Sequence, residues 1–543
     1  MKAFKNNYIL ILILTCLAVF FVNLDALYVN IMEARNFTTA REMLQDGNWI
    51  LTTINGEPRY QKPPLPTWLT AVSGAVFGLK SITALRLPAA IMGLVLVLTS
   101  YFLCFRITSN RLYAFVSGLV LTTSFYVVSA SRDGNWDIFT HAFMMVCIYF
   151  LWRFFTSEEN KYKHILIAAL FFGCSFMSKG PVSLYALLLP FLISFGIVYR
   201  YKNMKSRIVP LLVFLLLALP LSGWWHWYTF TYDPETVAEI TKRETSNWTG
   251  YNVRPFYYYW SFFTQSGIWT IMAFISLLYP YLKHRVFDKK GYRFSFLWTI
   301  ISLILLSIIP EKKSRYLLPV LIPLALNTAF YLEYLFRRFS ELKDKRETMP
   351  VYFNFGLIAT IGVAFPIAGY ILLHDQLAGK WIWFILLSVS LVGIGIYMFR
   401  NLFRKKIKPV FFASVVFIAA VICFGMPMAK ALTVNPSYKS YAELIPWQQA
   451  NDVDVYELTN FTPELLWAYG KPIEILQKDG EVKIPEENRF GVLVAAEDIE
   501  LFEAHFGSFT TQKITRYDMN AKGEGDRSHK TRLYRDLYLV IKR

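Results

Sequence analysis

Long runs of apolar residues constrain this chain more than any other feature of its sequence. About thirteen runs of roughly 17 to 25 mostly apolar residues occur, and a run of that length can cross a bilayer as a helix. The sequence therefore predicts a polytopic α-helical membrane protein. The predicted spans are 8–30, 85–105, 112–130, 138–156, 164–178, 181–199, 208–228, 261–282, 294–310, 315–336, 351–373, 381–399 and 409–429.

Composition and charge support that class. The chain has 543 residues, of which 55% are hydrophobic and 17% are charged, whereas a soluble domain carries about 25% charged residues. The net charge of +18 would suit a nucleic-acid partner. However, the positive excess lies in residues 1–430, whereas residues 431–543 contain more acidic than basic residues. We therefore expect a membrane domain (1–430), a soluble domain (431–543) and no nucleic-acid partner.

The basic residues also predict an orientation. With the N-terminus in the cytoplasm, the predicted inner segments carry more Lys and Arg than the longer outer loops. An odd number of spans then places residues 431–543 outside. The first outer loop, 31–84, includes a short apolar stretch at 65–79 that we expect to be an interfacial or re-entrant helix, and the second outer loop is 229–260.

Residues 431–543 show the pattern of a small α/β domain. Apolar alternation predicts strands near 453–458, 472–476, 490–495 and 534–541. Helical periodicity predicts helices at 462–469 and 497–506.

The sequence offers no metal or nucleotide motif. Its five cysteines all lie in apolar runs, without the spacing of a metal site, and no phosphate-binding glycine loop occurs. We therefore expect no metal and no other cofactor, and the missing ATP-binding motifs argue against an ATP-driven pump.

Charged residues gather at the predicted outer ends of the spans. Lys and Arg are costly at membrane depth unless they are paired or hydrated, so each such residue is a candidate for a functional site. Taken singly, each also has an ordinary explanation as a surface ion pair, a helix cap, a loop residue or a lysine that reaches the headgroups. The charged candidates are Glu33, Arg35, Arg59, Lys62, Arg132, Asp133, Asp137, Lys179, Lys313 and Arg315.

Cations and carboxylates on one face of a membrane have a definite chemical use. Arg and Lys can bind the phosphate of a lipid. If that phosphate carries a sugar, it is a good leaving group once its charge is neutralised, and a carboxylate can take the proton of an acceptor hydroxyl. An acceptor that is itself a phosphate needs no base.

At these residues the sequence resembles the GT-C type of glycosyltransferases, which use lipid-linked sugars. Within that type it is most similar to the bacterial aminoarabinose (4-amino-4-deoxy-L-arabinose) lipid A transferases and the related protein O-mannosyltransferases. The matching motifs, in order, are Glu33/Arg35, Ala40–Met43, Gly47–Trp49, Asn55–Leu65, Arg86-Leu87-Pro88, Asp137, Lys179-Gly180 and Arg315–Pro319.

The resemblance implies about thirteen spans, a first outer loop with juxtamembrane helices and a periplasmic C-terminal domain. It also implies roles for single residues. Glu33 would be the catalytic carboxylate of the first loop, and Asp137 a second one. Five residues would hold the phosphate or sugar of the donor: Arg35, Tyr60, Lys62, Lys179 and Arg315.

Two positions depart from the pattern of this family. The acidic pair usual in the first loop is reduced to Glu33, since Met32 replaces the aspartate regarded as catalytic. Gln61 replaces the acidic residue usual before Lys-Pro-Pro, which weakens any case for a metal at that place.

The resemblance implies inverting transfer of one sugar from a polyprenyl (undecaprenyl) phosphate donor to lipid A or a related envelope glycolipid. The reaction would take place on the outer face of the bacterial inner membrane. Two alternatives stay open. In the first alternative, the same donor is used and the acceptor is a protein Ser/Thr hydroxyl. In the second, the protein transports a lipid or sugar and catalyses no reaction. The polar residues lie at the ends of the predicted spans rather than at mid-membrane, which disfavours transport.

Overall fold

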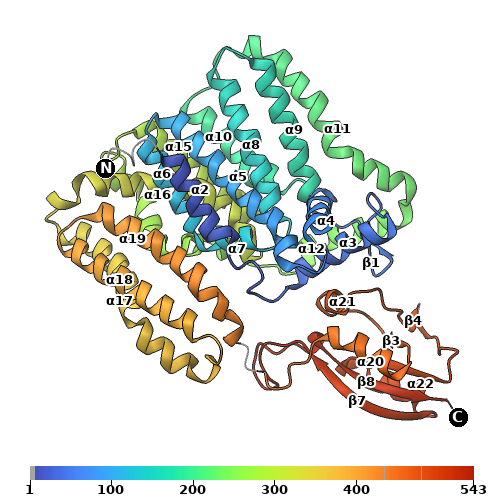
Figure 1. The fold of residues 1–543 in the computed structure, drawn as a ribbon. Helices are drawn as coiled ribbons and strands as arrows, with labels where there is room; N and C mark the ends of the chain where they lie inside the picture. The colour runs from blue at the N-terminus through green and yellow to red at the C-terminus, as the bar shows by residue number, and fades with distance from the viewer. Residues whose placement is uncertain (1–6, 433–434, 479, 543) are drawn as a thin grey trace. The chain divides into compact units, whose positions relative to one another are not determined.

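The structure is a computed structural model that describes residues 7–432, 435–478 and 480–542. The chain divides into two compact units (Figure 1). The first unit joins the chain up to Ala26 to Tyr60–Met428, and the second joins Leu27–Arg59 to Ala429–Arg543. The sequence predicted a boundary between residues 430 and 431, with all of the first outer loop in the membrane domain. In the structure, residues 27–59 of that loop group with the C-terminal residues instead.

The first unit is helical. Among the described residues, eight helices are long and apolar enough to cross a membrane. A ninth candidate is α6 (Arg111–Thr123) with α7 (Phe125–Arg132), two helices that bend by 65° at the extended residue Ser124. The eight helices are α5 (Ile82–Thr108), α8 (Asp137–Thr156), α11 (Ile208–Tyr232), α15 (Lys289–Ile308), α16 (Leu318–Arg338), α17 (Lys345–Leu373), α18 (Trp381–Phe403) and α19 (Ile407–Ala420).

Of the remaining predicted spans, 164–178 lies within the unbroken helix α9 (Lys161–Lys179), and the others are shorter or broken. Residues 8–30 form a helix only over Tyr8–Phe21, and the chain then turns at Asn23, which adopts a left-handed φ of 53°. The turn is held because the Asn23 amide donates to the carbonyls of Ile422 and Cys423, each at 3.0 Å. The predicted span 261–282 is divided into three short helices, with Gly267 at a left-handed φ of 66°.

Shorter elements complete the first unit. The predicted stretch 65–79 forms the helix α4 (Leu65–Phe77). The others are α2 (Tyr8–Cys16), η1 (Leu17–Phe21), α9 (Lys161–Lys179), η2 (Leu184–Leu188), α10 (Leu189–Val198), η3 (Met204–Arg207), α12 (Pro234–Gly250), η4 (Phe256–Tyr259), η5 (Phe262–Trp269), α13 (Thr270–Ser276), α14 (Tyr279–Leu282), η6 (Ser314–Leu317), η7 (Phe339–Glu341), η8 (His374–Gln376) and η9 (Val421–Gly425). The boundary between the two units falls within η10 (Met426–Leu432).

Glycines allow two of the long helices to approach closely. In Figure 1, α17 and α18 lie side by side. A Cβ atom on Gly362 would lie 2.7 Å from the carbonyl oxygen of Leu391, and one on Gly395 would lie 2.7 Å from that of Ala359. Each helix therefore requires a glycine opposite the backbone of the other, which is a common way to pack helices within a bilayer.

The second unit contains a four-stranded sheet with the strand order β3-β6-β8-β7. β3 and β6 are parallel, and β8 is antiparallel to both of its neighbours. Its strands and helices are β3 (Val455–Glu457), β6 (Arg489–Val494), β7 (Thr510–Asp518), β8 (Tyr534–Ile541), α20 (Leu444–Asn451), α21 (Pro463–Tyr469) and α22 (Ile499–Phe506), with the short η11 (Tyr441–Glu443), η12 (Ala496–Asp498), η13 (Thr531–Leu533) and the hairpin β4 (Gln477–Lys478) and β5 (Glu481–Val482).

The two faces of this sheet build separate apolar cores. Leu537 of β8 packs with Leu444 and Leu465, from α20 and α21. Val540 of the same strand packs with Phe502 of α22. Successive side chains of a strand point to opposite faces, so the sheet lies between α20 and α21 on one side and α22 on the other.

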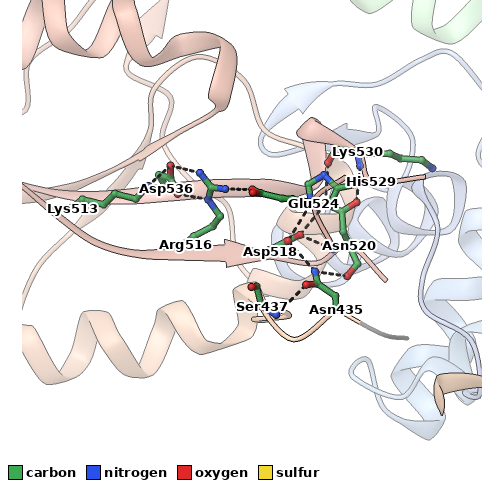
Figure 2. Close-up of polar contacts among 10 residues, drawn as sticks. All are labelled: Asn435, Ser437, Lys513, Arg516, Asp518, Asn520, Glu524, His529, Lys530 and Asp536. Atoms are coloured by element: carbon green, nitrogen blue, oxygen red, sulfur yellow. Dashed lines mark hydrogen bonds and ion pairs between the residues drawn. The ribbon is translucent and has the colours of Figure 1, made fainter. Parts of the chain in front are cut away.

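The predicted strand near 472–476 is only an isolated bridge between Ile475 and Glu457. The edge strand β7 was missed because polar residues line much of it and weaken the alternating pattern. Figure 2 shows how it pairs with β8: Arg516 donates to both carboxylate oxygens of Asp536, at 2.6 and 2.9 Å, and Lys513 lies 2.7 Å from the same carboxylate. Charged side chains protect a sheet edge from pairing with other chains.

A buried polar network closes the end of β7 (Figure 2). Asp518 accepts hydrogen bonds from the Asn435 amide at 2.9 Å and from the backbone N–H of Asn520 at 2.9 Å, and His529 Nε2 lies 3.3 Å from it. These contacts join Asn435, near the start of the C-terminal part of the second unit, to the loop between β7 and β8.

Candidate active site

Two helix ends meet in a buried ion pair. Asp137 is the first residue of α8, and Lys179 is the last residue of α9. The Lys179 ammonium contacts the Asp137 carboxylate, and each side chain is only 8% exposed. The Asn135 side chain accepts from the Asp137 N–H at 2.9 Å and fixes the start of α8. A charge buried to this degree requires a partner, so the pair sets where both side chains lie.

Three cations surround the ring of Tyr316. The nitrogen of Lys179 lies 5.1 Å from the ring centroid, and the charged groups of Lys313 and Arg315 each lie 5.8 Å from it. The Tyr316 hydroxyl donates to Glu311 at 3.2 Å. The ring is therefore the common wall of a cationic cluster, since the face of an aromatic ring attracts cations.

The charges of this cluster do not balance. Lys313 pairs with Glu311 at 2.6 Å, as Lys179 pairs with Asp137. Arg315 interacts electrostatically with Asp137, which already has Lys179 as a partner. Among the described residues, the buried Nε of Arg315 has no hydrogen-bond partner. Three cations against two carboxylates leave one positive charge and a spare N–H donor, so the cluster can accept an anion.

Lys312, the neighbour of these cations, has a structural role. Its ammonium donates to the carbonyls of Ile309 at 2.6 Å, Arg254 at 3.1 Å and Pro310 at 3.5 Å. Burial lowers the pKa of Lys312. The side chain joins the second outer loop to the loop that carries Lys313, and its donors are used within the chain.

Tyr60 and Lys62 contact the second outer loop. Tyr60 is 9% exposed and packs edge-on against Trp225, with ring centroids 6.5 Å apart. Burial and a hydrogen bond with Asp233 raise the pKa of Tyr60 to about 12. The Lys62 ammonium lies 3.7 Å from the Glu244 carboxylate on α12. Asp233 and Glu244 belong to the second outer loop, so that loop contacts both residues, whereas Trp225 lies on α11.

Arg132 stabilises the end of the first helix. Its guanidinium donates to the carbonyls of Val19 at 3.0 Å, Val22 at 2.7 Å and Asn23 at 2.7 Å. The neighbouring carbonyl of Asp133 accepts from the N–H of Asn135 at 2.8 Å. These contacts place Arg132 among backbone oxygens that a helix end leaves unsatisfied.

Three predicted site residues lie in the second unit, on or next to α3 (Ile31–Asp46). Glu33 is 1% exposed and completes a capping box with Asn30. Its carboxylate accepts from the Asn30 N–H at 3.2 Å and from the Asn30 amide at 3.0 Å. The carboxylate therefore stabilises the start of α3, a role that the sequence pattern Asn-x-x-Glu permits.

Arg35 and Arg59 are neighbouring cations. Burial, and to a smaller extent the charge of Arg35, lower the pKa of Arg59 to about 9, whereas the charge of Glu42 opposes the shift. Arg59 is 6% exposed, and its guanidinium contacts Thr39 at 3.5 Å. Two like charges this close repel each other, and an anion near them would remove the repulsion.

Glu42 organises the first loop, a role that the motif Ala40–Met43 did not reveal. Its fully buried carboxylate accepts from the Thr53 hydroxyl at 2.6 Å and from the N–H of Asn55 at 2.6 Å. It thereby holds the hairpin of β1 (Thr53–Ile54) and β2 (Glu57–Pro58) against α3. Tyr316 also lies in a motif, Arg315–Pro319, that predicted no role for it.

Metal ligands do not gather in the part of the chain that the structure describes: it contains no group of three or more His, Cys, Asp or Glu side chains able to hold an ion.

The helix arrangement defines a class of protein: a polytopic membrane protein with the GT-C fold. The structure matches ArnT from Cupriavidus metallidurans in the apo state, with a TM-score of 0.69 and 16% identity over 99% of this chain and 98% of that one. The match to the same protein bound to undecaprenyl phosphate has a TM-score of 0.68 and 14% identity, over 98% of both chains.

Sequence comparison is more specific. Residues 61–227 match the dolichyl-phosphate-mannose-protein mannosyltransferase family. The undecaprenyl phosphate-alpha-4-amino-4-deoxy-L-arabinose arabinosyl transferase of Pseudomonas savastanoi pv. phaseolicola is 27% identical over 304 residues, which are 55% of this chain and 56% of that protein. An arabinosyl transferase of the same description from Proteus mirabilis is 24% identical over 349 residues, 62% of this chain and 59% of that protein.

The chain thus spans between half and two thirds of the length of these curated relatives. It resembles the GT-C glycosyltransferases that use a polyprenyl-phosphate sugar, and the aminoarabinose transferases in particular.

Proposed function

We propose that this protein transfers a single sugar, with inversion, from a polyprenyl (undecaprenyl) phosphate donor to lipid A or a related envelope glycolipid. The observation that carries the proposal is the cluster around Tyr316, where Lys179, Lys313 and Arg315 exceed the charge of Asp137 and Glu311. A lipid phosphate is an anion that would supply the missing charge.

The reaction needs this positive charge. An acceptor oxygen attacks the anomeric carbon, the bond from that carbon to the phosphate oxygen breaks, and polyprenyl phosphate leaves with the electron pair. Lys179 and Arg315 would bind the donor phosphate and keep its charge neutralised while it leaves. Lys62, Arg35 and Tyr60 would bind other parts of the donor phosphate or sugar, with Arg59 and Lys313 as further contacts.

The carboxylates would act on the acceptor side. Glu33 is the proposed catalytic carboxylate of the first loop, taking the acceptor proton or orienting the acceptor, and Asp137 is the second. Met32 stands where the family usually has a further aspartate. A phosphate acceptor would suit that replacement, because a phosphate oxygen needs no base.

We place the reaction at the outer face of the bacterial inner membrane, with the N-terminus in the cytoplasm and the C-terminal residues in the periplasm. The basic residues of the predicted inner loops support this orientation. We also propose that the reaction needs no metal.

A second candidate function is transfer of the sugar to a protein Ser/Thr hydroxyl. The match of residues 61–227 to the protein mannosyltransferase family favours it specifically. A protein acceptor would require a base, so it places more weight on Glu33. The third alternative, lipid or sugar transport without chemistry, has no such observation in its favour.

Mass spectrometry of lipid A and of envelope glycoproteins, from cells with and without the gene, tests these alternatives. We expect a mass of one sugar to disappear from lipid A when the gene is deleted. Loss of the sugar from proteins alone would move the acceptor to Ser/Thr, and no change in either fraction would contradict a transferase acting on these acceptors.

Complementing the gene deletion with single-residue variants tests whether the modification depends on the cationic cluster. We expect the Lys179→Met variant to fail to restore the modification. Lys161→Met is the matched control, because Lys161 is the first residue of the same helix and pairs with Glu158 at 2.6 Å. Equal modification with both variants would contradict the assignment of Lys179.

A further inference from the structure

A second polar contact lies one helical turn beyond the Asp137–Lys179 pair. His141 follows Asp137 by four residues on α8, so both side chains lie on the same face of the helix. The Nδ1 atom of His141 lies 2.7 Å from the hydroxyl of Ser183. His141 is 1% exposed and Ser183 is fully buried.

The Asp137–Lys179 and His141–Ser183 contacts join residues with the same separation along the chain. Asp137 and Lys179 are 42 residues apart, and so are His141 and Ser183. Lys179 and Ser183 are the two ends of the tight turn Lys179-Gly180-Pro181-Val182-Ser183, in which Gly180 adopts a left-handed φ of 70°. The turn that carries Lys179 is therefore attached to α8 at both of its ends.

A third contact supports the same turn from α9. The Thr140 hydroxyl donates to the Ser175 carbonyl at 3.0 Å, and the Ser175 hydroxyl donates to the Thr140 carbonyl at 2.8 Å. Thr140 also lies 3.4 Å from the Ser183 hydroxyl. The side chains of His141, Thr140, Ser175 and Ser183 thus form one buried polar network. Buried polar groups are costly unless they are satisfied, and a satisfied network fixes one arrangement of its elements.

His141 is also electrically close to the ion pair. It interacts electrostatically with both Asp137 and Lys179. A small displacement of the turn would therefore change the position of the Lys179 ammonium relative to Asp137, Arg315 and the ring of Tyr316. At a site where charge must be placed accurately, such a displacement weakens anion binding.

We infer that His141 and Ser183 are a pair of positioning residues that hold the Lys179 turn in the arrangement that binds the donor phosphate. This inference rests on the proposed function. His141 itself does not touch the donor. Its effect passes through Ser183 and the turn, so it is expected in the binding of the phosphate rather than in the chemical step.

The test uses the full-length protein in detergent and measures transfer from undecaprenyl-phosphate-linked sugar. We expect His141→Phe and Ser183→Ala each to raise the KM for the donor about tenfold with little change in kcat, because each removes the buried hydrogen bond that joins the two side chains. Ser183→Ala removes only one oxygen atom, which makes it the safer variant if His141→Phe folds poorly.

Two controls separate positioning from general destabilisation. His141→Asn should restore most of the affinity, because an amide can present a polar atom near the place of Nδ1. His164→Phe is the matched substitution, since His164 is 2% exposed and lies near the other end of α9. We expect it to leave the KM for the donor unchanged.

Direct binding of undecaprenyl phosphate, measured by the shift it causes in thermal unfolding, should weaken by the same factor in His141→Phe. An unchanged KM in both His141→Phe and Ser183→Ala, or no recovery in His141→Asn, would overturn the inference. The absence of transfer by the wild-type protein would instead contradict the proposed function, while the binding experiment would still test the pair.

Discussion

Asn55 and Ile473 are 418 residues apart and form two hydrogen bonds with each other. The Asn55 amide donates to the Ile473 carbonyl at 2.8 Å, and its side-chain oxygen accepts from the Ile473 N–H at 2.8 Å. The side chain thus substitutes for a strand partner and attaches the first outer loop to the C-terminal part of the second unit.

This attachment places the first loop under the control of residues far along the chain. Glu42 holds the N–H of Asn55 on one side, and the ring of Phe37 on α3 packs against Trp467 on α21, with centroids 5.4 Å apart. The helix that carries Glu33 and Arg35 is therefore part of the same folded unit as residues 429–543.

Replacing Asn55 should loosen this attachment. We expect Asn55→Gly to keep the left-handed φ of 58° and to lose both side-chain hydrogen bonds, which would cost about 1 to 3 kcal/mol. Limited proteolysis should then cleave within residues 27–59 faster than in the wild type. Asn451→Ala is the control, because the Asn451 side chain bonds to the Trp447 carbonyl within its own helix. Unchanged cleavage in Asn55→Gly would contradict the role of the contact.

Two substitutions at Glu33 separate its cap from its charge. Glu33→Gln keeps an oxygen that can accept the bonds from Asn30, whereas Glu33→Ala removes the capping box. We expect Glu33→Gln to fold with wild-type stability and to lose transfer activity by about 100-fold or more, in the range of a general base. Glu33→Ala should lose activity and, in addition, about 1 kcal/mol of stability. Full activity in Glu33→Gln would leave the carboxylate with the capping role alone.

The ring of Tyr316, rather than its hydroxyl, should matter for binding. Tyr316→Phe keeps the aromatic face beside Lys179, Lys313 and Arg315. It loses the hydroxyl, with its hydrogen bonds to Glu311 and Arg315. Tyr316→Leu loses the face, and each cation–π contact contributes about 0.5 to 2 kcal/mol. We expect a donor KM close to wild type in Tyr316→Phe and at least a tenfold increase in Tyr316→Leu. The opposite order would show that the hydroxyl carries the effect.

Removing metal ions should leave transfer unchanged. Within the described residues, side chains that bind metals do not gather in groups of three or more, and Lys or Arg can neutralise the leaving phosphate instead. The measurement is activity of the purified protein before and after treatment with EDTA. A strong loss that Mg²⁺ or Mn²⁺ restores would contradict this prediction.

The second unit should lose stability in acid. Burial raises the pKa of Asp536, but hydrogen bonds from Arg516 and Lys513 outweigh this effect, and the net pKa lies below its ordinary value. The ion pairs therefore contribute stability above about pH 4, and that contribution is lost as the pH falls through the lowered pKa.

Near-ultraviolet circular dichroism of the full-length protein between pH 7 and pH 2 measures this loss. In Asp536→Asn the contribution is absent at every pH, so the pH dependence of unfolding should be shallower than in the wild type. Glu500→Gln is the control, because it also removes one carboxylate from the second unit, at an exposed position on α22. An identical pH dependence in wild type and Asp536→Asn would contradict the prediction.

Local sequence patterns determined the helical membrane class, because a long apolar run needs no distant partner to become a helix in a bilayer. They also gave most elements of the C-terminal α/β fold, from the periods of their apolar residues. The same patterns failed at residues 8–30 and 261–282, where turns at Asn23 and Gly267 interrupt apolar sequence. Composition does not reveal such turns.

Only the tertiary structure decided which charges meet. Lys312 and Lys313 are adjacent in the sequence, yet one is bound by backbone carbonyls and the other pairs with Glu311 beside Tyr316. The assignment of residues 27–59 to the second unit likewise depends on Asn55 and Ile473, and the contact between His141 and Ser183 depends on how a turn closes. Hydrogen bonds and ion pairs depend on distances of a few ångströms between segments far apart along the chain, and those distances are set by packing.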